Sequence, residues 1–296
     1  DLLVDRALPS ILGFASVKAN LGKLANKGFE LSLNGDIIRT NDFTWTSSGS
    51  FSFNRRKLKS LYGDMEDVLD ENGNVIGQKE KDDPKNGWFI GHDPDQIWDY
   101  EFGGVWQLGQ EEEASKYGCK PGDFRFIDQD GNGVLDDDDK TFQGYKTPRF
   151  FWSWRNEFIY KDFCLSFMLY SDIGHYDYYN HASNSGGMFD RYSTYDQPRW
   201  TPENPTNEYG RIGSYRFANY YKKKTFVRMD NISLSYAVPK DFLKKFKVQN
   251  MRISLTARNP FTITGWDYFD VEATKKNRDD GIYGMRSYNI SFNFTL

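Results

Sequence analysis

An alternation of apolar and polar residues with a period of two is the feature that most constrains the fold of this chain. It recurs along the 296 residues and is plainest at the carboxyl end, where every second residue is apolar: Tyr288, Ile290, Phe292, Phe294 and Leu296. Successive side chains of a strand point to opposite faces, so such segments predict antiparallel strands with one apolar and one polar face.

We predict nine strands from this pattern, over residues 28–39, 42–57, 84–91, 96–107, 149–159, 162–173, 225–238, 249–262 and 285–296. Segments of about ten residues with aromatic residues near their ends are typical of transmembrane β-barrels, whereas strands of soluble β-sandwiches are usually shorter. The mean hydropathy is negative although 17% of the residues are aromatic. A barrel that alternates apolar and polar residues has this kind of average.

The connections between the predicted strands alternate between short and long. The short ones are "RTND", "HDPD", "YKD" and "PKDFLKKFKVQ". Bacterial outer-membrane barrels have short periplasmic turns and long extracellular loops, so the alternation predicts a barrel whose last residue lies on the periplasmic side. Bacterial single-chain barrels usually have an even number of strands and are closed, whereas an open edge would leave unpaired backbone groups in lipid. We therefore expect further strands from residues 1–27 or from another polypeptide.

Charge and motifs exclude several functions. The formal net charge is −4 and the pI about 5.5, so we expect no nucleic-acid partner. The two cysteines, Cys119 and Cys164, have no metal-type spacing. The sequence also has no P-loop, no GxSxG, no CxxC and no dinucleotide fingerprint, and we predict that the chain is not an enzyme.

The segment "DQDGNGVLDDDDK" resembles a twelve-position calcium-binding loop. Gly133 takes the sixth position, where a sharp turn needs a residue without a side chain, and Leu135 is the apolar residue of the loop. Calcium requires six to eight oxygen ligands. The predicted ligands are Asp128, Asp130, Asn132, the carbonyl of Val134, Asp136 and Asp139. No nucleophile or base is paired with the loop, so we expect calcium to have a structural role, and because the flanks lack helical patterns we expect no conformational switch. The alternative is a solvated acidic turn.

Five stretches of the chain resemble, in the same order, the C-terminal region of SusC/RagA-type TonB-dependent transporters of Bacteroidetes. They are "LGKLANKGFELSL", the segment from "PGDFRFIDQDGNG" to "KDFCLSF", "RMDNISLSYAVP", "ISLTARNPFTIT" and the terminal strand. The resemblance implies that residues 1–296 are the C-terminal portion of an all-β, antiparallel transmembrane barrel of 22 strands with long extracellular loops. Neither a plug nor a TonB-binding segment is recognisable.

The resemblance also implies a function and partners. The family imports oligosaccharides, or in some members peptides, across the bacterial outer membrane with energy from TonB. A SusD-like surface lipoprotein closes over the extracellular mouth. We expect the loops 58–83, 108–148, 174–224 and 263–284 to face that lipoprotein, with the calcium-type loop 128–139 inside 108–148. The remaining N-terminal barrel and plug polypeptide and the lipid of the outer membrane are the other expected partners.

Several other residues are weaker candidates. His175, Asp177, His181 and Arg191 lie in an aromatic loop that could bind a glycan, a metal or the lipoprotein, or could be a packed loop. For Lys222, Lys223 and Lys224 we predict a solvated or lipopolysaccharide-facing cluster, and for Glu111, Glu112 and Glu113 a charged loop. Two other functions remain open: a soluble, calcium-stabilised β-rich carbohydrate-binding module and a secreted calcium-dependent hydrolase.

Overall fold

The structure is a computed structural model, and it describes residues 2–7, 16–179, 198–214, 220–267, 270–272 and 284–295. Two compact units make up the chain. We call residues 28–54, 147–175 and 223–296 the sheet unit, and residues 1–27, 55–146 and 176–222 the loop unit. Within the described ranges, no helix combines the length and the apolar character needed to cross a membrane.

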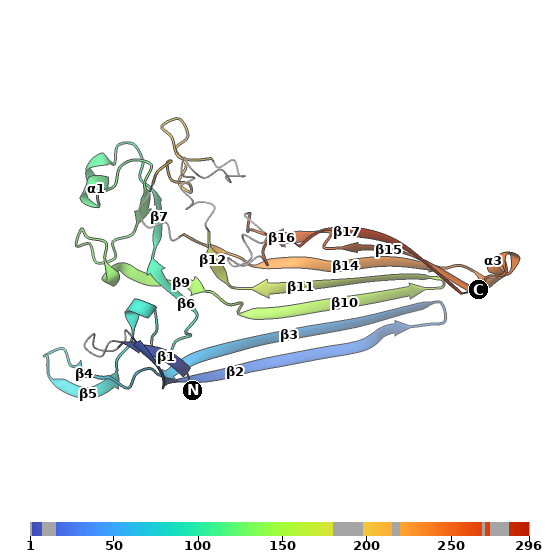
Figure 1. Cartoon of the computed structure of the whole chain (residues 1–296), viewed down its shortest axis with the longest axis horizontal. Coiled ribbons are helices and arrows are strands. Elements are labelled where there is room, and N and C mark those ends of the chain that lie inside the picture. Colours follow the sequence, from blue (N-terminus) through green and yellow to red (C-terminus); the bar gives the residue numbers. More distant parts are fainter. Residues whose placement is uncertain are drawn as a thin grey trace. The chain divides into compact units, whose positions relative to one another are not determined.

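Long antiparallel strands build the sheet unit, and neighbours in the sheet follow chain order (Figure 1). They are β2 (Ser16–Arg39), β3 (Phe43–Ser60), β10 (Phe150–Tyr160), β11 (Phe163–Ile173), β14 (Phe226–Ala237), β15 (Asn250–Arg258) and β17 (Ser287–Thr295). The short strand β16 (Thr262–Thr264) pairs with β14, and β1 (Leu2–Ala7) pairs with the first part of β2. In the described part of the chain these strands form one nine-stranded sheet.

The register places the apolar residues of neighbouring strands on the same face. Trp45 lies opposite Phe158, and Phe158 opposite Leu165. The row continues across the following strands through Leu234, Leu255 and Ile290. Residues that lie directly opposite in adjacent strands share a face, so the alternation read from the sequence becomes one continuous apolar face.

The other face of the sheet is polar and is joined by side-chain hydrogen bonds between strands. The hydroxyl of Thr46 donates to Asp36 at 2.7 Å. The hydroxyl oxygens of Ser50 and Ser153 are hydrogen-bonded at 2.7 Å, and those of Ser233 and Thr256 at 2.9 Å. Both faces therefore agree with the sequence prediction.

The apolar face is exposed where a soluble protein would cover it. The exposed fractions are 46% for Leu234, 54% for Leu255, 66% for Ile290 and 58% for Phe292. In a β-sandwich these residues would pack against a second sheet. A continuous exposed apolar surface of this kind marks a lipid or partner contact.

The predicted alternation of short and long connections is confirmed for three of the four short connections, whereas "HDPD" lies inside the long connection between β3 and β10. The short connections 40–42, 161–162 and 238–249 all lie at one end of the sheet unit, together with the last described strand end (Figure 1). The last of these contains α3 (Lys240–Leu243) and η4 (Lys244–Phe246). The long connections follow β3, β11 and β15.

Two of the nine predicted strands do not belong to the long sheet. Residues 84–91 are not a strand but contain the 3-10 helix η2 (Pro84–Asn86), which ends at Gly87 with a φ of 70°. A Cβ atom at Gly87 would lie 2.9 Å from the Cβ of Trp98, so close packing and a left-handed backbone both require glycine there. The aromatic residues of this segment give it a strand-like sequence pattern, but its turn residues prevent a strand.

Residues 96–107 are mostly in strands, as predicted, but they do not form one strand of the long sheet: they divide into the two short strands β6 (Gln96–Tyr100) and β7 (Phe102–Val105). The two strands are separated at Glu101, and the pairing of β7 with β8 shifts register between Phe102 and Gly104, which has a φ of 102°. The predicted loops 58–83 and 108–148 are consequently parts of one long connection between β3 and β10.

Short two-stranded pairs fill the loop unit. The pairs are β4 (Met65–Leu69) with β5 (Val75–Glu80), β6 with β9 (Lys140–Tyr145), β7 with β8 (Phe124–Phe126), and β12 (Tyr176–Tyr178) with β13 (Tyr221–Lys223). The helices are α1 (Glu111–Lys116) and the 3-10 helix η3 (Asp137–Asp139). Val105, Phe124 and Trp200 form a buried cluster against which Phe102 and Phe126 pack.

Candidate functional site

The acidic loop connects β8 to β9 in the loop unit, and its turns are formed by glycines. Gly131 and Gly133 have φ angles of 72° and 83°, in the left-handed region that disfavours residues with a Cβ atom. The requirement for glycine at the sixth position of the loop is therefore met in the structure. The chain then enters η3, where the Asp136 side chain accepts a hydrogen bond from the N–H of Asp138 at 3.0 Å.

The loop brings three carboxylates together. One carboxylate oxygen from each of Asp128, Asp130 and Asp139 lies within 4.8 Å of the others. Asp139 is fully buried, and its two oxygens accept hydrogen bonds from the backbone N–H groups of Gln129 at 2.7 Å and Asp136 at 2.8 Å. The first and last positions of the predicted calcium loop thus meet, although they lie eleven residues apart in the sequence.

Hydrogen bonds stabilise the charged form of Asp128. The N–H groups of Gly133 and Gly131 donate to its oxygens at 2.8 and 2.7 Å. The bond from Gly133 is the largest cause that lowers the pKa of Asp128 below its ordinary value, and the hydroxyl of Tyr117 contributes as well. Asp128 is therefore ionised at neutral pH, as a calcium ligand must be.

Two other predicted ligands are engaged in the turns of the loop. The side-chain oxygen of Asn132 accepts the N–H of Val134 at 2.7 Å, and Asp136 caps η3. Neither carboxylate oxygen of Asp136 belongs to the three-carboxylate cluster. The geometry thus places Asp128, Asp130 and Asp139 together, while a role for Asn132, Val134 and Asp136 stays a prediction.

The donor set fits calcium better than a transition metal. All ligands that the loop offers are oxygens, which calcium prefers, and neither histidine nor cysteine is part of the cluster. Three carboxylates this close repel one another unless a cation or protons reduce the charge. The residues present therefore fit a structural calcium ion, and calcium remains a prediction.

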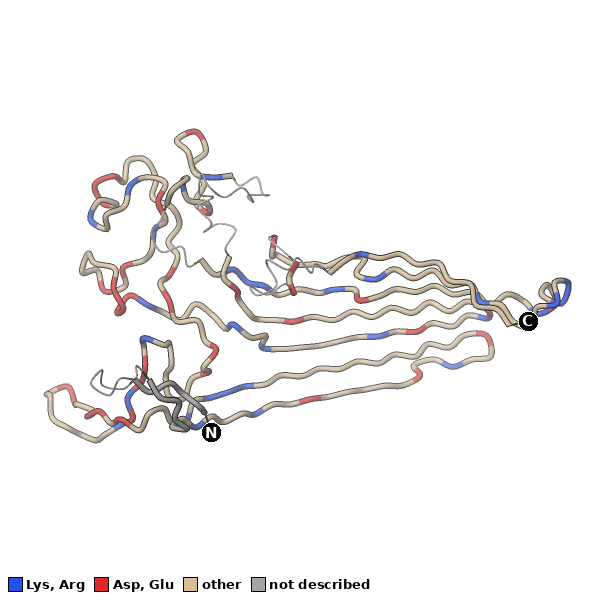
Figure 2. The backbone as a smooth tube through the Cα atoms, in the orientation of Figure 1, with Lys and Arg blue, Asp and Glu red and all other residues tan. Residues whose placement is uncertain are grey.

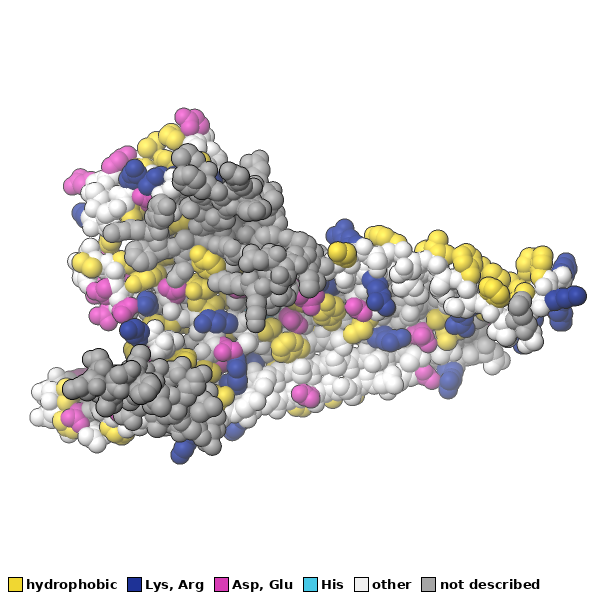
Figure 3. Space-filling view, in the orientation of Figure 1, with side chains coloured by type: hydrophobic (Ala, Val, Ile, Leu, Met, Phe, Trp, Pro, Cys, Tyr) yellow, Lys and Arg dark blue, Asp and Glu magenta, His cyan; other side chains and the backbone are white. Residues whose placement is uncertain are grey.

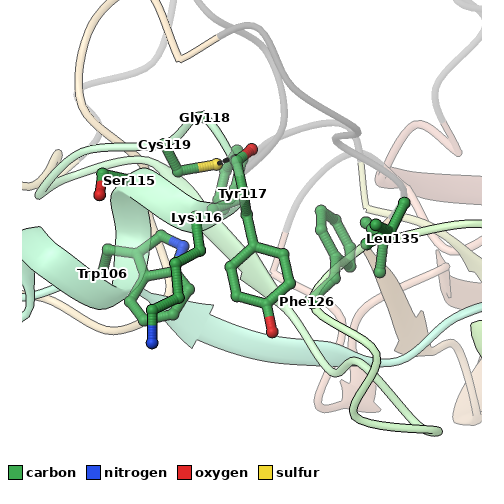
Figure 4. Close-up of a pocket in the computed structure, with 11 residues that line it drawn as sticks. Trp106, Ser115, Lys116, Tyr117, Gly118, Cys119, Phe126 and Leu135 are labelled. Carbon is green, nitrogen blue, oxygen red and sulfur yellow. Dashed lines mark hydrogen bonds between the residues drawn. The ribbon is translucent and has the colours of Figure 1, made fainter.

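A cavity of about 480 Å³ adjoins the loop within the loop unit (Figure 4). Its lining consists of Trp106, Ser115, Lys116, Tyr117, Gly118, Cys119, Phe124, Phe126, Gly133, Val134 and Leu135. The hydroxyl of Tyr117 donates to Asp128 at 2.9 Å, so one side chain joins the wall of the cavity to the carboxylate cluster. This bond to a carboxylate, together with burial, raises the pKa of Tyr117. The sequence has no spacing signal that would reveal this cavity.

In the sheet unit, Arg228 of β14 is the centre of an ionic cluster that sequence reasoning missed. Its guanidinium donates to both carboxylate oxygens of Asp270 at 2.8 Å and to the hydroxyl of Thr262 at 2.9 Å, and it also contacts Glu272. The hydroxyl of Tyr170 donates to Glu272 at 2.8 Å. Arg228 has a side chain only 4% exposed, so this cluster anchors residues 270–272 to the strands. No sequence signal joins residues that lie more than forty positions apart.

The basic residues around β13 differ from the predicted solvated cluster. Lys222 pairs with Glu208 at 3.2 Å and lies 4.5 Å from the centroid of the Tyr179 ring. Lys224 is 5% exposed and lies over the ring of Trp266. Only Lys223 is exposed, so packing rather than solvation accounts for this stretch.

The remaining candidates are distributed over other elements. Glu111, Glu112 and Glu113 form the first turn of α1, where negative charge is favourable, rather than a charged loop. His175 is buried, and its carbonyl accepts the N–H of Lys224 at 2.9 Å. Asp177 lies in β12. His181 and Arg191 lie outside the described residues.

The fold defines a class of protein. An antiparallel sheet with an exposed apolar face, a polar opposite face, short connections at one end and long ones at the other is the construction of a transmembrane β-barrel wall. The comparisons with known proteins agree, although no family model matches the chain.

Two curated relatives show the similarity in sequence. The chain is 31% identical over 284 residues to TonB-dependent receptor P3 of Formosa agariphila, covering 94% of this chain and 28% of the receptor. It is 28% identical over 286 residues to TonB-dependent receptor SusC of Bacteroides thetaiotaomicron, covering 92% of this chain and 26% of SusC. The chain thus spans less than a third of the length of these relatives.

Solved structures show the same fold. The RagAB peptide importer in its open-open state matches with a TM-score of 0.68 and 20% identity, over 100% of this chain and 31% of that chain. The closed-closed state gives a TM-score of 0.66 and 23% identity, over 99% of this chain and 32% of that chain. Sequence and fold together support a SusC/RagA-type TonB-dependent transporter and confirm the resemblance read from the sequence.

Proposed function

We propose that this chain forms the C-terminal part of the barrel wall of an outer-membrane importer for oligosaccharides or peptides. The observation that carries the proposal is the exposed apolar face that continues from strand to strand, with short connections at only one end of the sheet. Lipid would cover the apolar face, and the polar face would line the lumen. The polar groups of each strand would then face water rather than hydrocarbon.

The partners of this importer follow from the relatives. One set of similar structures is described as a peptide importer, and one curated relative is SusC. By analogy, a SusD-like lipoprotein would close over the long connections, and TonB would act through a plug that belongs to the remaining polypeptide. This chain supplies the wall and the extracellular connections in this proposal, and catalysis has no part in it.

Calcium would stabilise the long connection between β3 and β10. The carboxylates of Asp128, Asp130 and Asp139 would bind the ion, while Gly131 and Gly133 allow the backbone to turn around it. When bound, the ion would neutralise charge and crosslink the two ends of the loop. The bond from Tyr117 to Asp128 would extend this order to the neighbouring cavity.

Topology is tested by labelling single cysteines in the full-length protein, in a background without Cys119 and Cys164. Leu108→Cys places a thiol at an exposed site in the long connection, and Lys245→Cys places one at an exposed site in the short connection after β14. We expect a membrane-impermeant maleimide to label Leu108→Cys on intact cells and Lys245→Cys only after permeabilisation. The reverse result would refute the orientation.

Fractionation and co-purification test the assembly. We expect the protein in the outer membrane, and recovery in mild detergent with a plug-bearing polypeptide and a surface lipoprotein. A soluble, monomeric protein that binds a carbohydrate would instead support the calcium-stabilised binding module, and hydrolysis of that carbohydrate would support the hydrolase.

A further inference from the structure

A basic turn with exposed aromatic residues closes the short connection between β14 and β15. We call residues 240–247, which include α3 and η4, the basic turn. Its lysines, Lys240, Lys244, Lys245 and Lys247, are all exposed. Figure 2 shows this concentration of blue at the tip of the sheet unit. Asp241 is the single acidic residue of the turn, and it pairs with Lys244 at 2.7 Å.

Two phenylalanines of the basic turn are exposed as well. Phe242 is 55% and Phe246 63% exposed, and their ring centroids lie 5.4 Å apart. Exposing two paired aromatic rings to water is unfavourable, since each ring could bury a large apolar area. Rings surrounded by lysines are typical of a surface that enters the boundary between headgroups and acyl chains.

The turn is held in place by its own packing. Leu243 is buried, with 2% exposed, and its carbonyl accepts the N–H of Val248 at 3.3 Å. Lys247 has a φ of 58°, which turns the chain back toward β15. The exposed lysines and phenylalanines therefore lie on an ordered turn whose Leu243 is buried and whose helix α3 contacts β15.

Aromatic residues at the same end of the sheet indicate the depth of this turn in a membrane. Tyr160 and Phe163, on either side of the β10–β11 turn, are 53% and 49% exposed. The rings of Phe163 and Tyr236 lie 4.6 Å apart on the apolar face. Such aromatic residues mark the interface of membrane barrels. The basic turn begins four residues beyond Tyr236, which places its lysines at headgroup level.

We propose that the basic turn binds anionic phospholipid headgroups of the leaflet that the short connections reach. This inference rests on the proposed function, because it requires a barrel in the outer membrane. The lysines would bind the phosphate and the acidic headgroup, and Phe242 and Phe246 would lie among the first acyl carbons. Figure 3 shows hydrophobic side chains continuing along the sheet unit to the tip where the basic side chains lie. The excess of lysines over acids favours a lipid over a protein partner of mixed charge.

The test measures lipid binding by the detergent-purified full-length transporter, with phosphatidylglycerol and phosphatidylcholine titrated separately in native mass spectrometry. The variant is Lys244→Gln/Lys245→Gln, and its matched control is Lys57→Gln/Lys59→Gln, two exposed lysines near the other end of β3. Each lysine near an anionic surface contributes roughly fivefold to affinity, so we expect the variant to lose about 25-fold for phosphatidylglycerol and little for phosphatidylcholine. The control should keep its preference for phosphatidylglycerol.

A second variant tests the apolar contact with lipid separately from the charge of the lysines. Phe242→Ser/Phe246→Ser should weaken binding of both lipids by a similar factor, since it removes only apolar contact. Equal phosphatidylglycerol binding by the lysine variant, the control and the native protein would overturn the inference, even if the protein fractionates with the outer membrane. Failure to fractionate there would refute the proposed function instead.

Discussion

Replacing Leu255 by arginine tests whether the apolar face contacts lipid. Leu255 lies near the middle of β15, opposite Leu234 on one side and Ile290 on the other, and it is 54% exposed. The adjacent residue Thr256 points to the polar face, where its hydroxyl lies 2.9 Å from Ser233. The same substitution at Thr256 is therefore a matched control on the same strand.

We expect arginine to lower the free energy of unfolding by different amounts on the two faces. An arginine on the lipid face near the middle of a membrane barrel costs about 2–4 kcal/mol, which is a factor of about 30–800 in the folding equilibrium. At Thr256 the expected loss is about 1 kcal/mol, the contribution of one hydrogen bond. If the apolar face were exposed to water, Leu255→Arg would change stability by only about 0.5 kcal/mol.

The assay is reversible unfolding of the full-length protein from phospholipid vesicles in guanidinium chloride, followed by tryptophan fluorescence. We expect Leu255→Arg to lower the free energy of unfolding by at least about 1 kcal/mol more than Thr256→Arg. Equal effects of the two substitutions, or a neutral Leu255→Arg, would refute the assignment of the faces.

The loop and the ionic cluster give three further predictions. Asp128→Asn should weaken calcium binding by tenfold or more. We expect chelation to increase proteolysis of the loop in the native protein but not in this variant, and an unchanged calcium titration would contradict the site. Because the bond from Gly133 lowers the pKa of Asp128 below 3.8, its contribution to stability is fully present above that pH and is lost as the pH falls through the lower pKa of the folded state. Thermal unfolding of the native protein between pH 5 and 2 should show this loss, whereas Asp128→Asn should show less of it. Arg228→Gln should destabilise the anchored segment by about 2 kcal/mol or more, and hydrogen exchange at residues 270–272 should increase; additive effects of Arg228→Gln and Asp270→Asn would argue against the ion pair.

The sequence predicted the long strands well because each of them repeats a local signal. In β17, alternate residues from Tyr288 to Phe294 are apolar, and a period of two is sufficient to assign them to one face. The prediction failed between residues 84 and 107, where Trp88 lies just after the 3-10 helix η2 and Trp98 lies in the short strand β6 of the loop unit rather than in a strand of the long sheet. There the glycines with positive φ outweighed the local hydrophobic pattern.

Sequence by itself determined which side chains share a face, where the sheet turns sharply, and that Gly133 is needed in the acidic loop. These properties depend on the dihedral angles and the alternation of neighbouring residues, so they can be read locally. The spacing of the acidic loop also predicted that Asp139 lies near Asp128, as the structure shows. Only the tertiary structure decided that Tyr117 joins Asp128 to a cavity and that Arg228 holds Asp270. Such contacts join residues that lie far apart in the chain, or they depend on the path of the loop between the residues. Their geometry follows from the packing of the whole unit.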